Sequence, residues 1–182
     1  HAQPNVQERY LPKLYRGDMI ASQLFSEPGA GSDLASLQTR AIRDGDEWII
    51  TGQKVWTSGA HYSDIGEIIC RTDADLPKHK GLTMFVIPMD DPAITFTPVH
   101  TMGGERTNIT YYDDVKVDDK YRVGEVDGGW KVMMTALVFE RNSAWYGELV
   151  RLLDHGLGWA RNTASPTGGQ MIDDPLVQDV LQ

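Results

Sequence analysis

Two short stretches of the chain combine hydroxyl, acidic and aromatic side chains in a way that suits ligand binding. Residues 23–33 read QLFSEPGAGSD, and residues 54–59 read KVWTSG. The proline of the first stretch has no backbone donor, and its two glycines permit a positive φ and close approach of a ligand to the backbone. A strand that runs into such a loop is a common position for a ligand, although an ordinary turn has the same signature.

The side chains of these stretches suit a planar conjugated ligand. Such a ligand needs an aromatic wall and hydrogen-bond donors directed at its ring heteroatoms. Trp56 is a candidate for the wall, and Ser26 and Ser58, with their backbone N–H groups, are candidates for the donors. The alternative is that Trp56 packs in a core and Ser58 belongs to a turn. Spacing alone leaves both interpretations open.

Other common chemistries are not indicated by the sequence. The glycines of the first stretch lack the third glycine of a dinucleotide fingerprint, and no serine stands in a Gly-x-Ser-x-Gly elbow. The five histidines show no metal-ligand spacing, so no metal site is expected. The single cysteine, Cys70, lies in an apolar run and is expected to be a buried, inert thiol.

Length and charge limit the classes of protein. The chain has 182 residues, a hydrophobic content of 41% and a net charge of −9. Its length fits one domain, or one domain and part of another. An acidic chain without basic runs argues against nucleic acid as a partner, because neutralising phosphates needs basic patches. No apolar run approaches the roughly 20 residues that a membrane span needs.

The start of the chain is polar and begins at His1 rather than at a methionine. It does not resemble a signal peptide, and we expect the chain to be a piece of a longer protein. The use of one cysteine fits a reducing, cytoplasmic compartment.

The first two thirds of the chain reads as short strands separated by turns. Residues 9–16 resemble the end of a helix that Gly17 stops. Strand-like patterns then cover 19–26, 37–43, 47–50, 53–57, 65–72, 82–87, 94–99 and 108–117, with a hairpin signal at 44–46 and another turn at 51–52. Such spacing is typical of a β-sandwich or β-barrel.

The apolar period changes near Gly129. Residues 129–161 have apolar side chains at helical spacing, and a final amphipathic helix is expected over 175–182. The expected fold class is therefore α+β by segments. A central β-barrel or sandwich domain is followed by the long helices of an incomplete helical domain.

Four motifs resemble those of the acyl-CoA dehydrogenase superfamily, in the family's order and spacing. They are SEPGAGSD at 26–33, DGDEW at 44–48, GQKVWTSG at 52–59 and YDDVKV at 112–117. The resemblance covers essentially the whole chain. It implies the tail of an N-terminal helical domain over 1–18, a middle β-domain over 19–127 and the start of a C-terminal helical domain over 128–182.

The resemblance implies an FAD site in the middle domain. Gln23, Phe25 and Ser26 correspond to the family's segment beside the flavin pyrimidine ring, which gives backbone and hydroxyl hydrogen bonds. Trp56 resembles the family's aromatic side chain on the flavin. Ser58 resembles the hydroxyl residue beside flavin N5, where the family usually has threonine.

Three further positions are implied to contact ligands. Ser32 matches a residue near the CoA end of the substrate channel. Arg161 and Thr163 resemble residues that reach the flavin pyrophosphate across a subunit interface. Residues 164–169 depart from the family's usual continuation, so this last match is the weaker one.

Glu140 is the candidate catalytic base, and Arg141 is a candidate substrate-channel residue. In some branches of the family the base is a Glu on this helix, just before an Arg. In most others it lies further along, which here means beyond Gln182. The chemistry needs a carboxylate poised by desolvation in a dry channel. The alternative is a solvated carboxylate paired with a surface charge. Glu27, inside the first motif, is expected to be structural.

The resemblance implies FAD-dependent α,β-dehydrogenation of an acyl-CoA thioester. It also implies an electron-transfer flavoprotein as acceptor and a dimeric or tetrameric homo- or hetero-oligomer. Residues 58–62, SGAHY, resemble a bacterial branch in which some members act on bulky acyl groups. The alternatives are a flavin monooxygenase or oxidase of the same fold, and a non-catalytic subunit or domain fragment. By itself, such a fragment is expected to hold FAD weakly and to be inactive.

Overall fold

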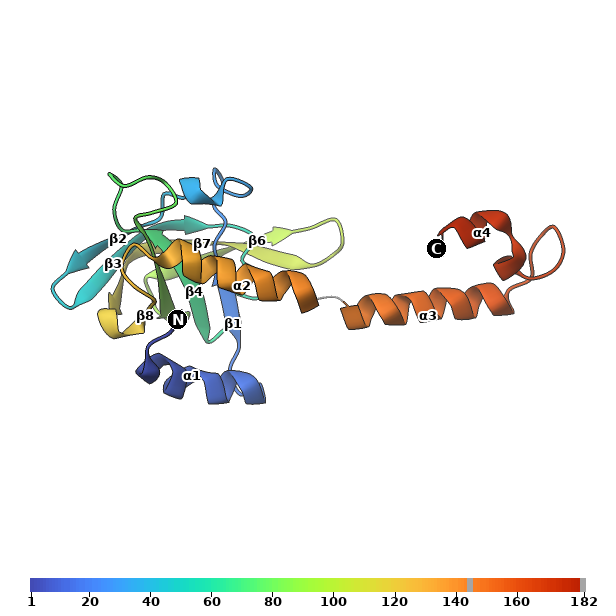
Figure 1. Ribbon diagram of the computed structural model, residues 1–182, viewed down its shortest axis with the longest axis horizontal. Coiled ribbons are helices and arrows are strands. Elements are labelled where there is room, and N and C mark those ends of the chain that lie inside the picture. The colour runs from blue at the N-terminus through green and yellow to red at the C-terminus, as the bar shows by residue number, and fades with distance from the viewer. Residues whose placement is uncertain (144–145, 181–182) are drawn as a thin grey trace. The chain divides into compact units, whose positions relative to one another are not determined.

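The computed structural model describes residues 1–143 and 146–180, and it divides the chain into two compact units. The first unit, His1–Ala136, contains the β-sheet, and the second, Leu137–Gln182, consists of helices and a loop over 163–170 where it is described (Figure 1). The expected domain boundaries after residues 18 and 127 remain predictions.

Most elements belong to the first unit. In chain order they are α1 (Pro4–Arg16), β1 (Ala21–Leu24), the 3-10 helix η1 (Leu34–Ser36), β2 (Arg40–Asp44), β3 (Glu47–Lys54), β4 (Ile65–Arg71), β5 (Leu82–Pro88), β6 (Ile94–His100), β7 (Arg106–Asp118), η2 (Asp119–Tyr121) and β8 (Arg122–Val123). Helix α2 (Gly129–Ser143) begins in this unit and continues into the second. The second unit also holds α3 (Tyr146–Asn162), η3 (Met171–Asp173) and α4 (Pro175–Val180).

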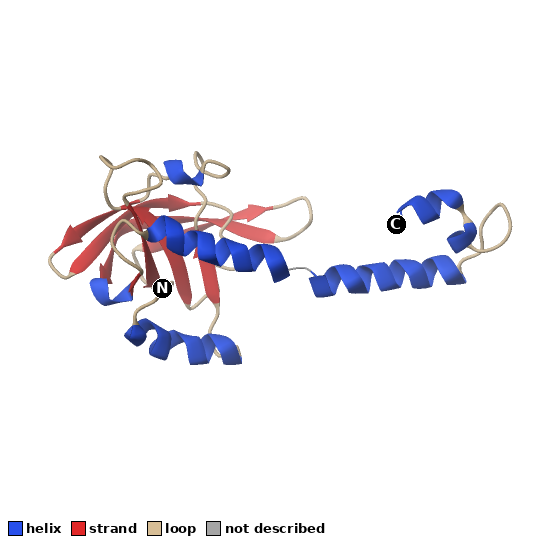
Figure 2. Ribbon diagram, viewed as in Figure 1, coloured by secondary structure: helices blue, strands red, loops and turns tan. Residues whose placement is uncertain are grey.

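The eight strands form one mixed sheet, which confirms the expected α+β class (Figure 2). Its order is β6-β7-β3-β2-β4-β5-β8, and β1 pairs in parallel with β4. Strand β2 meets β4 at one residue pair, Arg40 with Arg71, so the sheet bends sharply there. The path ends at β6 and β8 without closing, so the structure is sandwich-like and not a closed barrel.

The strands on the two sides of the bend share one buried hydrophobic cluster. Trp48 on β3 and Phe85 on β5 are not on neighbouring strands, yet their ring centroids lie 5.3 Å apart. On β3, Trp48 and Ile50 point inward opposite Val117 and Val115 of β7, all four being buried. Buried and more exposed side chains thus alternate along β3 with a period of two residues, which favours a strand over a helix.

The prediction of a turn at 51–52 is wrong. Strand β3 runs unbroken to Lys54, and its register to β7 shifts between Ile50 and Gly52. A Cβ on Gly52, which has a φ of +152°, would lie 2.6 Å from Oγ1 of Thr39. Glycine inside a strand signals a bulge as readily as a turn, and the close approach of Thr39 explains why glycine stands here. Residues 53–54 of the short strand expected at 53–57 are the end of β3, and residues 55–57 lie outside any strand.

Helix α1 is longer than the sequence indicated. It begins at Pro4, where proline fits the first turn, and ends at Gly17 with a φ of 74°, as expected. Its buried side chains Val6 and Tyr10 pack on Ile65 of β4. The first helical residue of α2, Gly129, lies so close to β5 that a Cβ would be 2.8 Å from the carbonyl oxygen of Leu82.

The single helix expected over 129–161 is described as α2 and α3, on either side of residues 144–145, which lie outside the described residues. Residues 181–182 of the expected last helix also lie outside them. Among the helices that the structure describes, none is long and apolar enough to cross a membrane.

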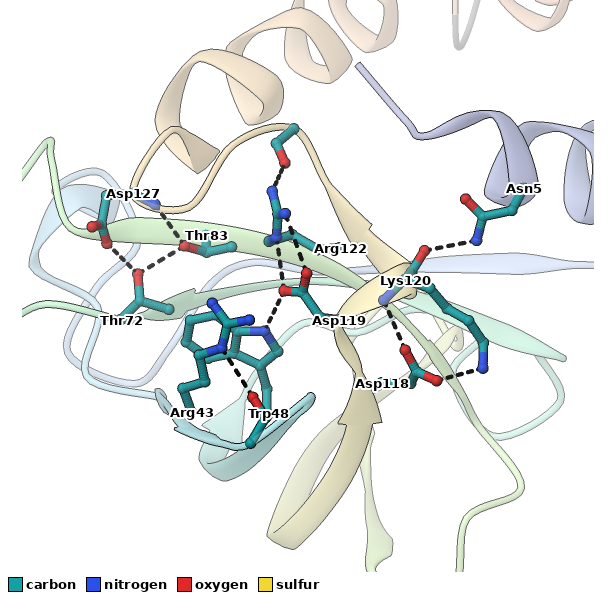
Figure 3. Close-up of polar contacts among 12 residues, drawn as sticks. Asn5, Arg43, Trp48, Thr72, Thr83, Asp118, Asp119, Lys120, Arg122 and Asp127 are labelled. Atoms are coloured by element: carbon teal, nitrogen blue, oxygen red, sulfur yellow. Dashed lines mark hydrogen bonds and ion pairs between the residues drawn. The ribbon is translucent and has the colours of Figure 1, made fainter.

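Polar contacts fasten η2, β8 and the segment before α2 to the rest of the first unit (Figure 3). The indole Nε1 of Trp48 donates to Asp119 at 2.7 Å, and Nε of Arg122 donates to the same carboxylate at 3.0 Å. Further along, the hydroxyl of Thr72 donates to Asp127 at 2.6 Å. The buried indole N–H and the carboxylates are therefore satisfied where β3, β4 and β8 meet the following segment.

We expect the Gly52→Ala substitution to destabilise the first unit by about 1–3 kcal/mol, because the methyl group would overlap Thr39 at the bulge. Thermal unfolding followed by circular dichroism measures the change. Gly103→Ala is the matched control, since its Cβ would have only Thr101 nearby, at 3.8 Å. Equal unfolding midpoints for the two variants would contradict the role given to the bulge.

Candidate functional site

The two motif stretches lie side by side in the first unit. The backbone N–H of Val55 donates to the carbonyl oxygen of Ser26 at 2.8 Å. The hydroxyl of Ser22 donates to the carbonyl oxygen of Ser58 at 3.0 Å. The ends of β1 and β3 therefore bring Ser26 and Ser58 onto adjacent loops, as the planar-ligand interpretation requires.

A buried ion pair joins the same loops. The side chain of Lys54 is 0% exposed, and its Nζ donates to the carbonyl oxygen of Phe25 and to Oε1 of Glu27, both at 2.9 Å. The carboxylate of Glu27 also accepts the backbone N–H groups of Gln38 and Thr39, at 2.6 and 2.8 Å. Each carboxylate oxygen thus has an N–H donor, and Glu27 has the structural role that was expected of it.

The surroundings of the pair set its protonation. Burial alone would raise the pKa of Glu27, but the ammonium of Lys54 and the two backbone N–H groups outweigh it and leave that pKa below its usual range. Burial lowers the pKa of Lys54, and the carboxylate opposes this effect. Burial also raises the pKa of the nearby Cys70 thiol to about 12, so this thiol is protonated and inert, as expected.

Trp56 is an exposed, conformationally strained aromatic residue. Its φ is 57° and the residue is 64% exposed, which rules out the interpretation as a core residue. A bulky residue in this left-handed region costs about 1–3 kcal/mol, and such strain concentrates at ligand sites. Hydrogen bonds of the next residue fix this backbone conformation. The backbone N–H and Oγ1 of Thr57 donate to the carbonyl oxygen of Asn108 at 3.1 and 2.9 Å, and Nδ2 of Asn108 donates to the carbonyl oxygen of Thr57 at 3.0 Å.

A groove of about 340 Å³ runs beside the exposed indole. It is lined by Glu27, Pro28, Val55, Trp56, Val99 and Ile109. Most of these side chains are apolar, which suits a flat conjugated ring system.

The other predicted residues near the groove differ in exposure. Ser26 is half-buried and Ser58 is exposed, with its hydroxyl 3.3 Å from Oγ1 of Thr107. Gln23 lies on the exposed face of β1, whereas the side chain of Phe25 is buried. Any contact that Phe25 makes with a ligand is therefore through its backbone.

Ser32 stands in the exposed loop before η1. The adjacent Asp33 forms an ion pair with Lys78 at 2.8 Å, and its carboxylate also accepts the hydroxyl of Ser36 at 2.7 Å. The loop that carries Ser32 is thus fastened to the segment between β4 and β5.

The remaining predicted residues lie in the second unit. Glu140 and Arg141 are exposed on α2, and Arg161 is exposed near the end of α3. Thr163 is half-buried, and its carbonyl oxygen accepts the N–H of Met171 at 2.8 Å. The roles of these residues stay predictions.

Sequence reasoning missed Lys54 and Asn108 as supports of the site. The available signal for Lys54 was the period-2 alternation of β3, in which it shares the inward positions of Trp48 and Ile50. Asn108 carried no comparable signal, because its partner Thr57 lies 51 positions away. Within the part of the chain that the structure describes, no group of three or more His, Cys, Asp or Glu side chains is placed to hold a metal ion.

Comparison with known proteins identifies the class of the first unit. The family described as "Acyl-CoA dehydrogenase, middle domain" matches residues 22–115, which include both motif loops and most of the sheet, from β1 into β7. The chain belongs to the acyl-CoA dehydrogenase family, and the resemblance of its motifs is confirmed.

Individual relatives share the family but not the length of this chain. The acyl-CoA dehydrogenase FadE26 of Mycobacterium tuberculosis is 40% identical over 173 residues, which are 93% of this chain and 43% of the relative. The solved structure titled "Tcur3481-Tcur3483 steroid ACAD" is 40% identical with a TM-score of 0.85 and covers 98% of this chain and 46% of that one. The ChsE4-ChsE5 complex from M. tuberculosis is 38% identical with a TM-score of 0.84, and it covers 100% of this chain and 47% of that one. The chain thus spans less than half the length of these relatives.

We expect Glu27→Gln to destabilise the protein by about 3–5 kcal/mol, because it leaves the buried ammonium of Lys54 without a counter-charge. The double variant Lys54→Met/Glu27→Gln should recover most of this loss, since it has no buried charge. Denaturant unfolding measures both changes. Asp18→Asn is the control, because its ion pair with Arg16 is exposed and is worth at most about 1 kcal/mol.

The stability that Glu27→Gln loses relative to wild type depends on pH in a defined direction. The pKa of Glu27 is lower in the folded than in the unfolded protein, so the stabilisation is complete above about pH 4.3 and disappears as the pH falls through the lowered value. The gap in stability between wild type and Glu27→Gln should therefore narrow below about pH 4. A gap that stays constant from neutral pH into this acid range would contradict the assignment of an ionised Glu27.

Proposed function

We propose that the protein is an FAD-dependent dehydrogenase that introduces an α,β double bond into an acyl-CoA thioester. The observation that carries the proposal is Trp56, a strained tryptophan presented to solvent in the second motif loop, within the region that matches the family's middle domain. Strain of this kind persists only where the surrounding structure imposes it, and an exposed indole gives a flavin a face to lie on.

The residues around Trp56 fit a flavin. Among the described residues, no hydrogen-bond acceptor is assigned to the backbone N–H of Ser26 and no partner to its hydroxyl, so both are available to a ring edge. The hydroxyl of Ser58 lies on the adjacent loop. The apolar groove beside the indole offers space for a flat ligand.

Each residue then has a defined task. Ser26, with the backbone of Phe25, holds the pyrimidine edge, Gln23 flanks it, and the hydroxyl of Ser58 donates toward N5. Donors fixed at these edges stabilise the electron-rich form of the ring system without reorganisation during the reaction. The flavin, when bound, supplies the redox chemistry by accepting two electrons as hydride from the substrate β-carbon.

The acid–base step belongs to the second unit in this proposal. The carboxylate of Glu140 takes the α-proton, and the electron pair of the broken α-C–H bond forms the double bond as the β-hydride leaves. Arg141 lines the substrate channel and Ser32 lies toward the CoA end. Arg161 and Thr163 hold the flavin pyrophosphate of a partner subunit, in a homo- or hetero-oligomer.

The acyl group is proposed to be bulky and steroid-like. The support is the 40% identity to a structure whose title names a steroid acyl-CoA dehydrogenase, and that title and the ChsE4-ChsE5 complex both pair two components. The electron acceptor is proposed to be an electron-transfer flavoprotein.

We expect Glu140→Gln in the full-length protein to lower turnover by at least about 100-fold while FAD stays bound, because the amide cannot accept the α-proton. Steady-state kinetics and the flavin absorbance measure the two properties. Glu148→Gln, another exposed carboxylate of the second unit, is the matched control. Near-normal turnover of Glu140→Gln would place the base elsewhere.

Substrate class and acceptor are tested on the full-length, FAD-loaded protein without oxygen. We expect acyl-CoAs with a steroid ring system to bleach the flavin at lower concentrations than straight-chain acyl-CoAs. The bleached protein should be reoxidised by an electron-transfer flavoprotein and only slowly by oxygen. Fast reoxidation by oxygen would favour the oxidase or monooxygenase alternative, and equal bleaching by all acyl-CoAs would refute the proposed substrate class.

A further inference from the structure

The buried ammonium of Lys54 contacts the peptide group that carries one of the proposed flavin donors. Nζ of Lys54 donates to the carbonyl oxygen of Phe25 at 2.9 Å. The same peptide group includes the N–H of Ser26. In a trans peptide the C=O and N–H bonds point in opposite directions. Because the carbonyl oxygen faces the buried ammonium, the N–H of Ser26 points away from it.

We propose that Lys54 acts through this peptide group to strengthen the N–H of Ser26 as a donor, and so favours the reduced state of a flavin bound there. This inference rests on the proposed function, because it needs a flavin beside Ser26. It adds a role for a positioning residue that does not itself touch the cofactor.

The physical basis is polarisation along a chain of hydrogen bonds. A cation that binds a carbonyl oxygen draws electron density through the amide and makes its N–H a better donor. The effect is large only where water does not screen the charge, and the side chain of Lys54 is 0% exposed. Reduction places extra electron density on the ring system, so a stronger donor binds the reduced form more tightly than the oxidised form.

Glu27 fixes the position of the ammonium and limits its effect. Its carboxylate cannot swing away, because the N–H groups of Gln38 and Thr39 hold its two oxygens. The carboxylate lies 2.9 Å from Nζ, so its negative charge offsets part of the field of Lys54. Removing the carboxylate alone, at a pH low enough to keep the amine of Lys54 protonated, should therefore increase the polarisation, whereas removing both charges should abolish it.

These opposite signs separate an electrostatic role from a merely structural one. If the pair only braces the two loops, both substitutions loosen the site and shift the flavin in the same direction or not at all. If Lys54 polarises the peptide group, Glu27→Gln and the double variant Lys54→Met/Glu27→Gln shift the reduction potential in opposite directions.

The test measures the two-electron midpoint potential of FAD bound to the full-length protein, by anaerobic titration with a reference dye. We expect the potential to rise in Glu27→Gln and to fall below the wild-type value in the double variant. A tenfold change in the ratio of the affinities for reduced and oxidised flavin corresponds to about 30 mV. We expect at least this difference between the two variants, and no shift in the control Asp18→Asn.

Each outcome decides the inference. Equal potentials, or shifts of both variants in one direction, would overturn it. If Glu27→Gln fails to fold, the double variant decides together with its affinity for oxidised FAD. A potential below wild type at an unchanged affinity supports the inference, and an unchanged potential, or one lowered only together with a loss of affinity, refutes it. A wild-type protein that binds no FAD would overturn the proposed function along with the inference. A wild type that binds FAD and is bleached by acyl-CoA, with unmoved potentials in the variants, would overturn the inference only.

Discussion

The buried ion pair between Lys54 and Glu27 is the interaction on which the geometry of the site depends. An ammonium taken out of water costs several kcal/mol, and only well-placed acceptors offset that cost. Here the acceptors are the carbonyl oxygen of Phe25 and the carboxylate of Glu27, both on the loop after β1. Any movement of this loop away from β3 would leave a buried charge unpaired. The pair therefore contributes a unique arrangement of the two motif loops more than it contributes net stability.

The strained backbone at Trp56 follows from this arrangement. Two residues before it, Lys54 is fixed in the interior, and immediately after it, Thr57 is held by three hydrogen bonds to Asn108. The chain must pass between these anchors in few residues, and the left-handed conformation of Trp56 is the result. The strained backbone at Trp56 lowers the stability of the fold while it presents the indole to solvent. Such strain is typical of a residue whose side chain contacts a ligand.

The alternation of apolar and polar residues was sufficient to predict most strands of the sheet. It was insufficient to predict the bulge in β3, the short strand β8 and the bend between β2 and β4. Alternation identified β3 and β7 because Trp48, Ile50 and Tyr112 each bury a large apolar side chain on one face. It failed at Gly52, where a bulge and a turn look the same until Thr39 is seen against the glycine. Strand β8 was not expected, because two residues are too few for a period to show. The sharp bend between β2 and β4 is tertiary and leaves no local trace.

The motif loops of the site were predictable, but the residues that hold them were not. Lysine is almost never fully buried, so the residue type alone gives no indication of the interior position that Lys54 occupies. Its partner Glu27 lies 27 positions away, and no local pattern connects the two. Once β3 is known to run through Gly52, its alternation places Lys54 inward, in conflict with its charge. A charged residue at an inward position of a strand requires a buried partner, and the acid of the other motif, Glu27, supplies it. Such a conflict between periodicity and charge is therefore a signal for an organising ion pair.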